Sequence, residues 1–257
     1  MMPFRIGTTS YILPDEILPN VRYLADKVRD IELVLFEVDD DLGNLPPVEV
    51  ISELAVLTRE HDLTYTVHLP LDLRLGSDGQ EGRHALIKAR GVMERTRPLD
   101  PWAYVVHLDG TNSGAHAAWV ERSAGALEQA ADWAGDPARI AVENLEGHAE
   151  GLIEPVLDRV AVSRCVDVGH LWVDGLDPIP YLRKALPRTR VIHLHGIAER
   201  DHRSLLHVPA EQLNLVLECL LRANYRGVVT MEVFNEEDFV SSQAVLERAM
   251  KELWARS

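Results

Sequence analysis

Short apolar runs alternate along the chain with longer segments in which apolar residues recur every three or four positions. The short runs are rich in β-branched residues and predict buried strands, whereas the longer segments predict helices with one apolar face. We expect strands at residues 4–10, 31–38, 64–69, 103–107, 139–144, 164–167, 191–195 and 228–232. A helical segment follows each strand, and eight such units predict a parallel sheet that closes into a single (β/α)8 barrel.

The composition agrees with one folded unit. A chain of 257 residues has the usual length of a TIM barrel, so we expect a single domain over residues 1–257. Cys165 and Cys219 lie in apolar segments and are interpreted as small buried hydrophobic residues, without a disulfide framework. No signal peptide begins the chain and no apolar stretch reaches the ~20 residues that a membrane span needs. We therefore expect a cytoplasmic protein.

The formal net charge of −15 restricts the class of partner. Proteins that bind duplex DNA or RNA normally neutralise phosphates with Lys and Arg, and an acidic surface repels phosphates unless a local positive patch or a bound metal overrides it. We therefore expect a small-molecule substrate, and neither a nucleic acid nor a membrane as partner. The sequence does not indicate an oligomeric state.

Ionisable side chains gather where the expected strands end. Within residues 191–196, His193 and His195 share one face of the strand, because side chains alternate, and a glycine follows them. Six expected strands end in this way, in His, Glu or Asp. The carboxyl ends of all strands in a (β/α) barrel open on one rim, so we expect residues far apart in the sequence to meet there.

Imidazoles and carboxylates together form the ligand set of zinc, manganese and iron sites. Burying so many ionisable groups without a metal would be costly, so we predict a divalent metal centre. The predicted ligands are His68, His107, Glu143, Asp167, His170, His193, His202 and Glu232. His202 lies on the polar loop 198–207, where a solvated histidine is the alternative interpretation.

Other residues near the rim are predicted to contact a substrate. Ser10, Tyr11 and Glu37 follow the first two strands, and the alternative for Glu37 is that it only braces the barrel. His195 and His207 are either metal ligands or hydrogen-bonding partners of the substrate. The remaining histidines fall on helices or loops away from strand ends, and we interpret them as surface residues: His61, His84, His116 and His148.

The order of the strand-end residues is His, His, Glu, Asp-x-x-His, His and Glu, and it resembles the xylose isomerase-like TIM barrel superfamily. Within that superfamily it resembles the apurinic-site endonuclease branch, which has a zinc cluster. The resemblance implies a metal tetrad, shared with sugar epimerases and isomerases, of Glu143, Asp167, His193 and Glu232. It also implies that His68 and His107 hold further zinc ions, and it matches His170 to the histidine of the Asp-x-x-His pair.

One loop departs from the pattern of this branch. The branch has Asp-x-His after its seventh strand, whereas this chain has Arg200-Asp201-His202. The resemblance carries over to His202 and leaves open whether Asp201 is a ligand or a substrate contact. The implied cofactor is therefore a divalent metal, zinc or alternatively manganese, with one to three ions.

Residues 6–14, 17–22 and 32–37 are similar to the cobamide-remodelling phosphodiesterases of this superfamily. This narrower resemblance implies hydrolysis of the phosphodiester in the nucleotide loop of a cobamide such as cobalamin, which yields cobinamide and the lower-ligand ribonucleotide. The implied catalytic residues are Glu143, Glu232, His170 and His195. The implied substrate contacts are Ser10, Tyr11, Glu37, Asp201 and His207.

Three alternative functions stay open. A sugar epimerase or isomerase would use a single metal on the tetrad, with Glu143 and Glu232 as acid and base. An apurinic-site endonuclease-type nuclease would use the same ligands on DNA, which the acidic charge disfavours. A barrel that only binds a cobamide or sugar phosphate would leave this many metal-type ligands unexplained. The sequence indicates neither the preferred lower ligand nor the identity of the metal.

Overall fold

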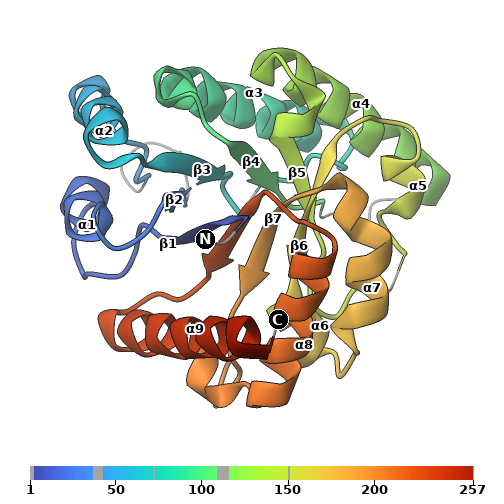
Figure 1. Cartoon of the computed structure of the whole chain (residues 1–257). Helices are drawn as coiled ribbons and strands as arrows, with labels where there is room; N and C mark the ends of the chain where they lie inside the picture. The colour runs from blue at the N-terminus through green and yellow to red at the C-terminus, as the bar shows by residue number, and fades with distance from the viewer. Residues whose placement is uncertain (1–2, 37–42, 72, 109–115, 150, 257) are drawn as a thin grey trace.

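The computed structural model describes residues 3–36, 43–71, 73–108, 116–149 and 151–256. Eight parallel strands form a closed barrel in sequence order, with helices around its outside (Figure 1). The strands are β1 (Arg5–Thr9), β2 (Asp30–Val34), β3 (Thr64–His68), β4 (Ala103–Val106), β5 (Ile140–Glu143), β6 (Ser163–Asp167), β7 (Thr189–Leu194) and β8 (Val228–Met231). This architecture confirms the predicted (β/α)8 TIM barrel.

The connections between strands are mostly helical. The α-helices are α1 (Ile17–Leu24), α2 (Val48–His61), α3 (Gly79–Thr96), α4 (His116–Ala134), α5 (Glu154–Leu157), α6 (Val168–Val173), α7 (Pro178–Ala185), α8 (Ala210–Arg222) and α9 (Glu236–Arg256). Four short 3-10 helices join them: η1 (Arg97–Leu99), η2 (Pro137–Arg139), η3 (Leu186–Arg188) and η4 (Leu205–His207). Most of these bounds lie close to the expected ones, and the connections after β5 and β6 differ.

The spacing of apolar residues over 152–160 predicts a helix after β5, but α5 forms a single turn. Arg188 donates hydrogen bonds to the carbonyl oxygens of Leu157 and Val160, at 2.8 Å each, and these are groups that a longer helix would use internally. After β6 the chain forms α6, which was not expected. The carboxylate of Asp167 accepts a hydrogen bond from the backbone N–H of His170 at 2.7 Å and so caps this helix.

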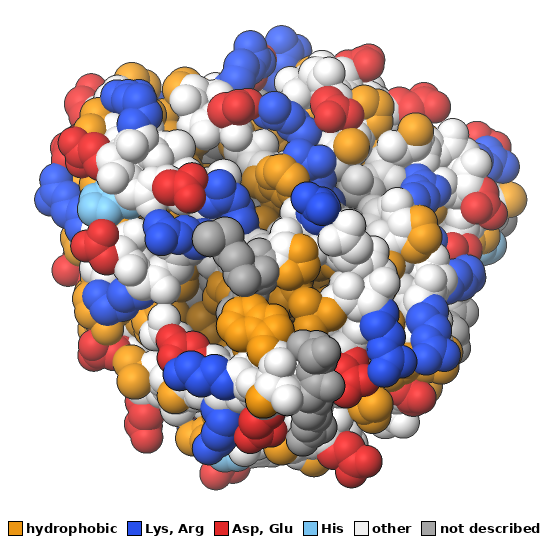
Figure 2. Space-filling model, viewed as in Figure 1, with side chains coloured by type: hydrophobic (Ala, Val, Ile, Leu, Met, Phe, Trp, Pro, Cys, Tyr) orange, Lys and Arg blue, Asp and Glu red, His pale blue; other side chains and the backbone are white. Residues whose placement is uncertain are grey.

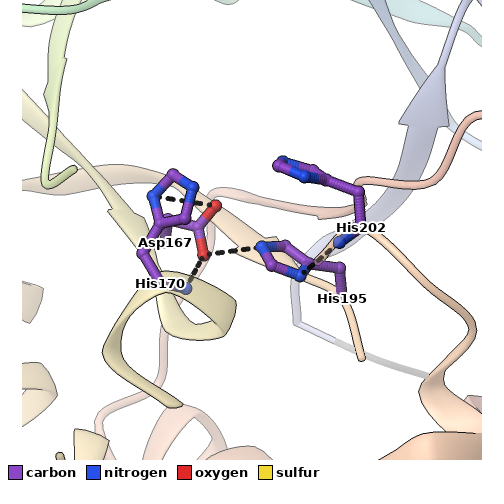
Figure 3. Close-up of side chains that lie close together, drawn as sticks. All are labelled: Asp167, His170, His195 and His202. Carbon is purple, nitrogen blue, oxygen red and sulfur yellow. Dashed lines mark hydrogen bonds and ion pairs between the residues drawn. The ribbon is translucent and has the colours of Figure 1, made fainter. Parts of the chain in front are cut away.

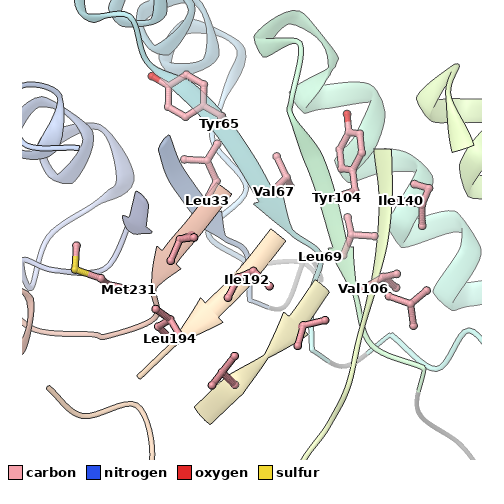
Figure 4. Close-up of a cluster of buried hydrophobic side chains, with 14 of the residues drawn as sticks. Leu33, Tyr65, Val67, Leu69, Tyr104, Val106, Ile140, Ile192, Leu194 and Met231 are labelled. Atoms are coloured by element: carbon pink, nitrogen blue, oxygen red, sulfur yellow. The ribbon is translucent and has the colours of Figure 1, made fainter. Parts of the chain in front are cut away.

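The two faces of each strand pack differently. Large apolar side chains such as Leu33, Tyr65 and Ile192 belong to one extended hydrophobic cluster that the strands share with the helices (Figure 4). A second cluster consists of small apolar residues on neighbouring strands: Ala103, Val105, Ala141, Cys165 and Val191. Because these residues come from β4 to β7 and form a cluster apart from the helix-facing one, they fill the inside of the barrel.

Ionisable residues lie two positions after residues of the second cluster, toward the carboxyl ends of the same strands. Side chains of a strand alternate, so residues two positions further on point to the same side. These residues are His107, Glu143, Asp167 and His193. The pairing of β6 with β7 sets Asp167 beside His193, which places both at the same level of the barrel. The layer toward the carboxyl ends of the strands is therefore polar.

Strand β2 ends earlier than expected. The side chain of Asn44 accepts a hydrogen bond from the backbone N–H of Phe36 at 2.8 Å and donates to the carbonyl of Val34 at 2.8 Å. These are the groups through which the strand would have continued its pairing. Glu37, which we expected on this strand, lies outside the described residues.

The described helices show no membrane span, because none of them combines the length and the apolar character that crossing a bilayer requires. Figure 2 shows one face of the molecule, on which Lys and Arg side chains alternate with Asp and Glu around a central hollow lined by hydrophobic side chains. On this face neither sign of charge forms a continuous patch.

Candidate metal centre

The metal ligands predicted at the strand ends lie together at the carboxyl-end rim of the barrel. His68, Glu143 and Asp167 are the last residues of β3, β5 and β6, and His107 and Glu232 directly follow β4 and β8. Their side chains, with those of their neighbours, form groups whose ligand atoms lie within 4.8 Å of one another. The rim therefore concentrates imidazoles and carboxylates as the sequence predicted.

The first group consists of His68, His107 and Glu143. Nε2 of His107 is 2.9 Å and Nε2 of His68 is 3.3 Å from the same oxygen, Oε2 of Glu143. Nδ1 of His68 donates a hydrogen bond to the backbone carbonyl of Leu69 at 2.8 Å, so Nε2 is the nitrogen that would bind a metal after losing its proton. Two imidazole nitrogens and one carboxylate oxygen thus converge in the manner of a divalent metal site.

The second group is fully buried and consists of Glu143, Asp167, His193 and Glu232. Nδ1 of His193 is 3.1 Å from Oε1 of Glu143, 3.1 Å from Oε2 of Glu232 and 3.8 Å from Oδ2 of Asp167. One imidazole nitrogen therefore faces three carboxylates. Despite burial, these negative charges hold the pKa of His193 well above its usual range, and a divalent cation could take the place of its Nδ1 proton.

The third group consists of Asp167, His170, His195 and His202 (Figure 3). Asp167 lies between two histidines, with Oδ2 at 3.5 Å from Nδ1 of His170 and Oδ1 at 3.3 Å from Nε2 of His195. The rings of His195 and His202 stack with centroids 4.2 Å apart. Nε2 of His202 also lies 3.3 Å from Oε2 of Glu232, which ties this group to the second one.

The histidines of the third group have different environments. The backbone N–H of His202 donates to Nδ1 of His195 at 3.1 Å. Nε2 of His195 lies 3.3 Å from Oδ1 of Asp167 and makes no hydrogen bond within the described part of the chain, so it can pair with Asp167 or bind a metal. His202 itself has a φ of +51°, a left-handed conformation that non-glycine residues seldom adopt and that is concentrated at functional sites.

Two carboxylates join the three groups into one centre. Glu143 presents Oε2 to the first group and Oε1 to the second. Asp167 presents Oδ2 to His193 of the second group and to His170 of the third, at 3.8 and 3.5 Å, and Oδ1 to His195 of the third at 3.3 Å. A carboxylate that offers its two oxygens to different groups can bridge two cations, so the arrangement has donors for more than one ion.

The charges of the centre shift its pKa values strongly. Burial lowers the pKa of His68, but the hydrogen bond and the charge of Glu143 outweigh burial and raise this pKa to about 9. Burial likewise lowers the pKa of His202, and Glu232 outweighs it and raises the pKa to about 10. Burial raises the pKa of Glu143 and of Glu232, yet the charge of His193 brings both well below their usual range. The carboxylates are therefore ionised at neutral pH.

A divalent metal fits this donor set. Oδ2 of Asp167 is buried and accepts no hydrogen bond within the described part of the chain, and the nitrogens of His170 and His193 lie 3.5 and 3.8 Å from it. This oxygen belongs to the second group, where an unpaired carboxylate oxygen is costly unless a cation balances it. The described residues thus include groups that can hold a divalent cation.

Zinc binding should release protons at neutral pH. Imidazoles bind metals through a lone pair, and the raised pKa values of His68 and His202 keep both protonated at pH 7 in the metal-free protein. The apparent affinity for zinc should therefore rise with pH, about tenfold per pH unit for each displaced proton. The rise should continue up to about pH 9 for the proton of His68 and up to about pH 10 for that of His202. Calorimetry in buffers of different ionisation enthalpy measures this release, and a binding enthalpy independent of the buffer would contradict it.

Gly169 allows the close approach of His195. A Cβ atom at Gly169 would lie 2.2 Å from Cε1 and Nε2 of the His195 ring, which is fully buried and stacked on His202. We expect Gly169→Ala to lower the free energy of unfolding by about 1–3 kcal/mol through overpacking. The matched control is Gly91→Ala in α3, where no atom lies within 4 Å and the gain should be about 0.5–1 kcal/mol. Chemical denaturation measures both, and equal or greater stability of Gly169→Ala would rule out this packing role.

The predicted substrate contacts lie around the centre with different exposure. Ser10 is fully buried and its hydroxyl accepts a hydrogen bond from the N–H of Val34 at 3.2 Å, so it braces the rim. Tyr11 is 36% exposed. Asp201 lies 3.1 Å from Nδ1 of His202, and His207 is exposed on η4. Their contact with a substrate stays a prediction, as does that of Glu37, which the structure does not describe.

The histidines that we interpreted as surface residues lie outside the metal groups described above. His84 and His116 are exposed on α3 and α4. His61 is half-buried at the end of α2, with Nδ1 2.7 Å from a carboxylate oxygen of Asp26. His148 is half-buried in the loop after β5. Two of these four histidines are therefore exposed and two are half-buried.

Two residues at the centre were not predicted. Glu32 is fully buried on β2, with Oε2 2.9 Å from Nε2 of His193. Its signal in the sequence is alternation, since it lies on the opposite face of β2 from the apolar Ile31 and Leu33. Asn144 bridges β5 and β6 by exchanging hydrogen bonds with the backbone N–H and C=O of Asp167, at 3.0 and 2.9 Å. No pattern in the sequence distinguished Asn144.

Comparisons with known proteins identify the fold. The family model of the xylose isomerase-like TIM barrel matches residues 25–256, whereas no curated protein matches the sequence at a significant level. Similar solved structures include a D-tagatose 3-epimerase-like protein, 20% identical with a TM-score of 0.80 over 98% of this chain and 99% of that one. They also include endonuclease IV from Thermus thermophilus, 19% identical with a TM-score of 0.72 over 95% of this chain and 99% of that one.

A further solved structure of this kind is 3-keto-D-glucoside 4-epimerase from E. coli, 18% identical with a TM-score of 0.71 over 96% of this chain and 99% of that one. At these identities the likeness shows the fold, which is shared by epimerases and endonucleases. The family match covers most of the chain, from before β2 to the end of α9. The chain belongs to the xylose isomerase-like TIM barrel family.

Proposed function

We propose that this protein is a metal-dependent phosphodiesterase that hydrolyses the phosphodiester in the nucleotide loop of a cobamide such as cobalamin. The observation that carries the proposal is the row of three ligand groups joined by Glu143 and Asp167. In phosphodiester hydrolysis, the attacking and the leaving oxygens lie on opposite sides of phosphorus, and cations on both sides stabilise the transition state. A centre with donors for several ions suits this reaction.

The residues of the metal centre would have different roles in this reaction. Divalent cations, when bound, would neutralise charge on the phosphoryl oxygens and make water a better nucleophile. Glu143 and Glu232, both ionised and buried, each lie 3.1 Å from Nδ1 of His193 and would orient the attacking water and the phosphate. His195 would hold Asp167 in place. His170 donates from Nδ1 to the carbonyl of Asn144 at 2.9 Å, which leaves Nε2 to contact the substrate.

The net charge of the protein and an aromatic side chain at the rim of the barrel support this choice of substrate. A net charge of −15 disfavours a polyanionic duplex and is compatible with a small phosphodiester. Tyr11 packs edge-on against Phe36, with ring centroids 5.1 Å apart, and is 36% exposed, so it offers an aromatic surface to an organic group beside the phosphate. The cobamide itself is proposed from the resemblance of residues 6–14, 17–22 and 32–37.

The test is an assay of the purified, metal-stripped protein after zinc or manganese is added back. Cobalamin should be converted to cobinamide and the lower-ligand ribonucleotide, which mass spectrometry detects separately. Duplex DNA with an abasic site serves as the second substrate and should be cut more slowly or not at all. If cobalamin stays intact with either metal while the DNA is cut, the nuclease alternative replaces the proposal.

A sugar epimerase is the second candidate, and one observation favours it. Glu143 and Glu232 each lie 3.1 Å from Nδ1 of His193, so two carboxylates meet beside one ligand group, and one could take a proton from a carbon next to a carbonyl while the other returns it. The fold is also similar to that of a D-tagatose 3-epimerase-like protein. Deuterium uptake from solvent into a ketose, followed by NMR, tests this function, and uptake without cobalamin cleavage would establish it in place of the first.

A further inference from the structure

Glu32 is a buried carboxylate that the proposed reaction does not use. It lies in the middle of β2, away from the strand end, and its side chain is fully buried. Oε2 of Glu32 is 2.9 Å from Nε2 of His193, while Oε1 accepts no hydrogen bond within the described part of the chain. An ionised carboxylate in the interior of a barrel is costly, so this pair requires an explanation.

His193 faces carboxylates on both edges of its ring. Nδ1 lies 3.1 Å from both Glu143 and Glu232, in the second ligand group, and Nε2 faces Glu32. A metal-bound imidazole is neutral, with one N–H and one lone pair. Glu32 only accepts hydrogen bonds, so the N–H stays on Nε2 and donates to Glu32. The lone pair of Nδ1 then faces the second group, where a cation would take the place of the Nδ1 proton.

We propose that Glu32 is a positioning residue, which fixes the tautomer and the orientation of the His193 ring so that Nδ1 binds a divalent cation together with Glu143, Asp167 and Glu232. This inference rests on the proposed function only in requiring a cation at the second group. It requires nothing of the substrate. A carboxylate behind a metal-binding histidine also makes the imidazole a stronger ligand, which is a general property of such pairs.

Direct binding of the same cation by Glu32 is the competing interpretation. Glu32, His68 and Glu232 do have ligand atoms within 4.8 Å of one another. However, the Glu32 oxygen that contacts His193 lies at Nε2, on the edge of the ring opposite the three carboxylates of the second group. A cation at Nδ1 and the carboxylate of Glu32 are therefore separated by the imidazole. The two interpretations predict different numbers of bound ions after substitution.

The experiment measures zinc affinity and stoichiometry of the full chain by competition with a chromophoric chelator. Glu32→Gln keeps the size of the side chain and removes its charge, and Glu32→Leu removes the acceptor as well. We expect the ion of the second group to bind about 10- to 100-fold more weakly, with the larger loss in Glu32→Leu and an unchanged number of ions. The cobalt-substituted protein should show shifted visible bands in Glu32→Gln, because the ring and its basicity change.

Asp30→Asn is the matched control. Asp30 is also buried, two residues earlier on the same face of β2, and it accepts a hydrogen bond from Thr64 at 2.6 Å in place of an imidazole. Burial raises the pKa of Asp30 to about 7, so this carboxyl group is partly protonated at neutral pH. Asp30→Asn therefore removes a buried carboxyl group from the same strand, as Glu32→Gln does. The control should keep the wild-type zinc affinity and cobalt spectrum. Loss of affinity in the Glu32 variants alone then separates positioning from a general loss of stability.

Each outcome is decisive. The inference is overturned if Glu32→Gln and Glu32→Leu both keep the wild-type affinity and spectrum. Where Glu32→Leu does not fold, the same result in Glu32→Gln alone overturns it. Loss of one whole ion in Glu32→Gln would make Glu32 a ligand and would overturn its positioning role. A wild-type chain that binds no divalent metal would overturn this inference and the proposed function together. A wild-type chain that binds metal but leaves cobalamin intact would remove the proposed function only, and the affinities would still test Glu32.

Discussion

Glu143→Gln should leave the protein with fewer bound ions and should reduce the proposed phosphodiester hydrolysis by more than about 100-fold. This loss exceeds the 10- to 100-fold that is typical when a residue hydrogen-bonded to a metal ligand is replaced. The reason is that Glu143 serves two groups at once, with Oε2 at 2.9 Å from His107 and Oε1 at 3.1 Å from His193. A neutral amide offers a single oxygen and no charge, so it cannot balance cations on both sides. Elemental analysis of the purified variant and the cobinamide assay measure the two effects.

The matched control for this variant is Glu146→Gln. Glu146 is exposed in the loop after β5, three residues beyond Glu143, so the same chemical change leaves the three groups intact. We expect wild-type metal content and activity for this control. A Glu143→Gln protein that keeps its full metal content would show that the carboxylate does not join the groups, and the row of sites would then be wrong.

The fold could be predicted because each strand has a strong local signal and the barrel needs only their number and order. Where the prediction differed, distant side chains decided the structure. The single turn of α5 reflects Arg188, which takes up carbonyls of the residues after that turn. The extra helix α6 begins where the side chain of Asp167 caps it. Neither interaction has a signature in the local pattern of apolar residues.

The candidate site could be predicted where chemistry coincides with a strand end. His68, Glu143 and Asp167 each end a strand, and the barrel geometry then brings them together. Glu32 has the same residue type but lies in mid-strand, where apolar neighbours dominate the pattern and hide a carboxylate that faces the barrel interior. Loop residues are harder still, since His202 reaches Glu232 only through a left-handed backbone conformation.

The double variant His68→Ala/His107→Ala separates the two candidate functions. Nε2 of both histidines faces one oxygen of Glu143, at 3.3 and 2.9 Å, and without them the first group retains a single carboxylate. We expect the loss of one ion per chain and a fall in phosphodiester hydrolysis of more than about 100-fold. The second group, which contains neither histidine, should keep its ion. Elemental analysis and the cobinamide assay again give the readout.

The corresponding control is His84→Ala/His116→Ala, which removes two exposed imidazoles from α3 and α4 and should change neither metal content nor activity. An epimerase that needs one cation between Glu143 and Glu232 would respond differently to the first pair of substitutions. Its ion would stay bound through His193, and ketose turnover would continue at the wild-type rate. A single ion per chain before and after the loss of His68 and His107 would therefore assign the chemistry to the second group and favour proton transfer at carbon over hydrolysis at phosphorus.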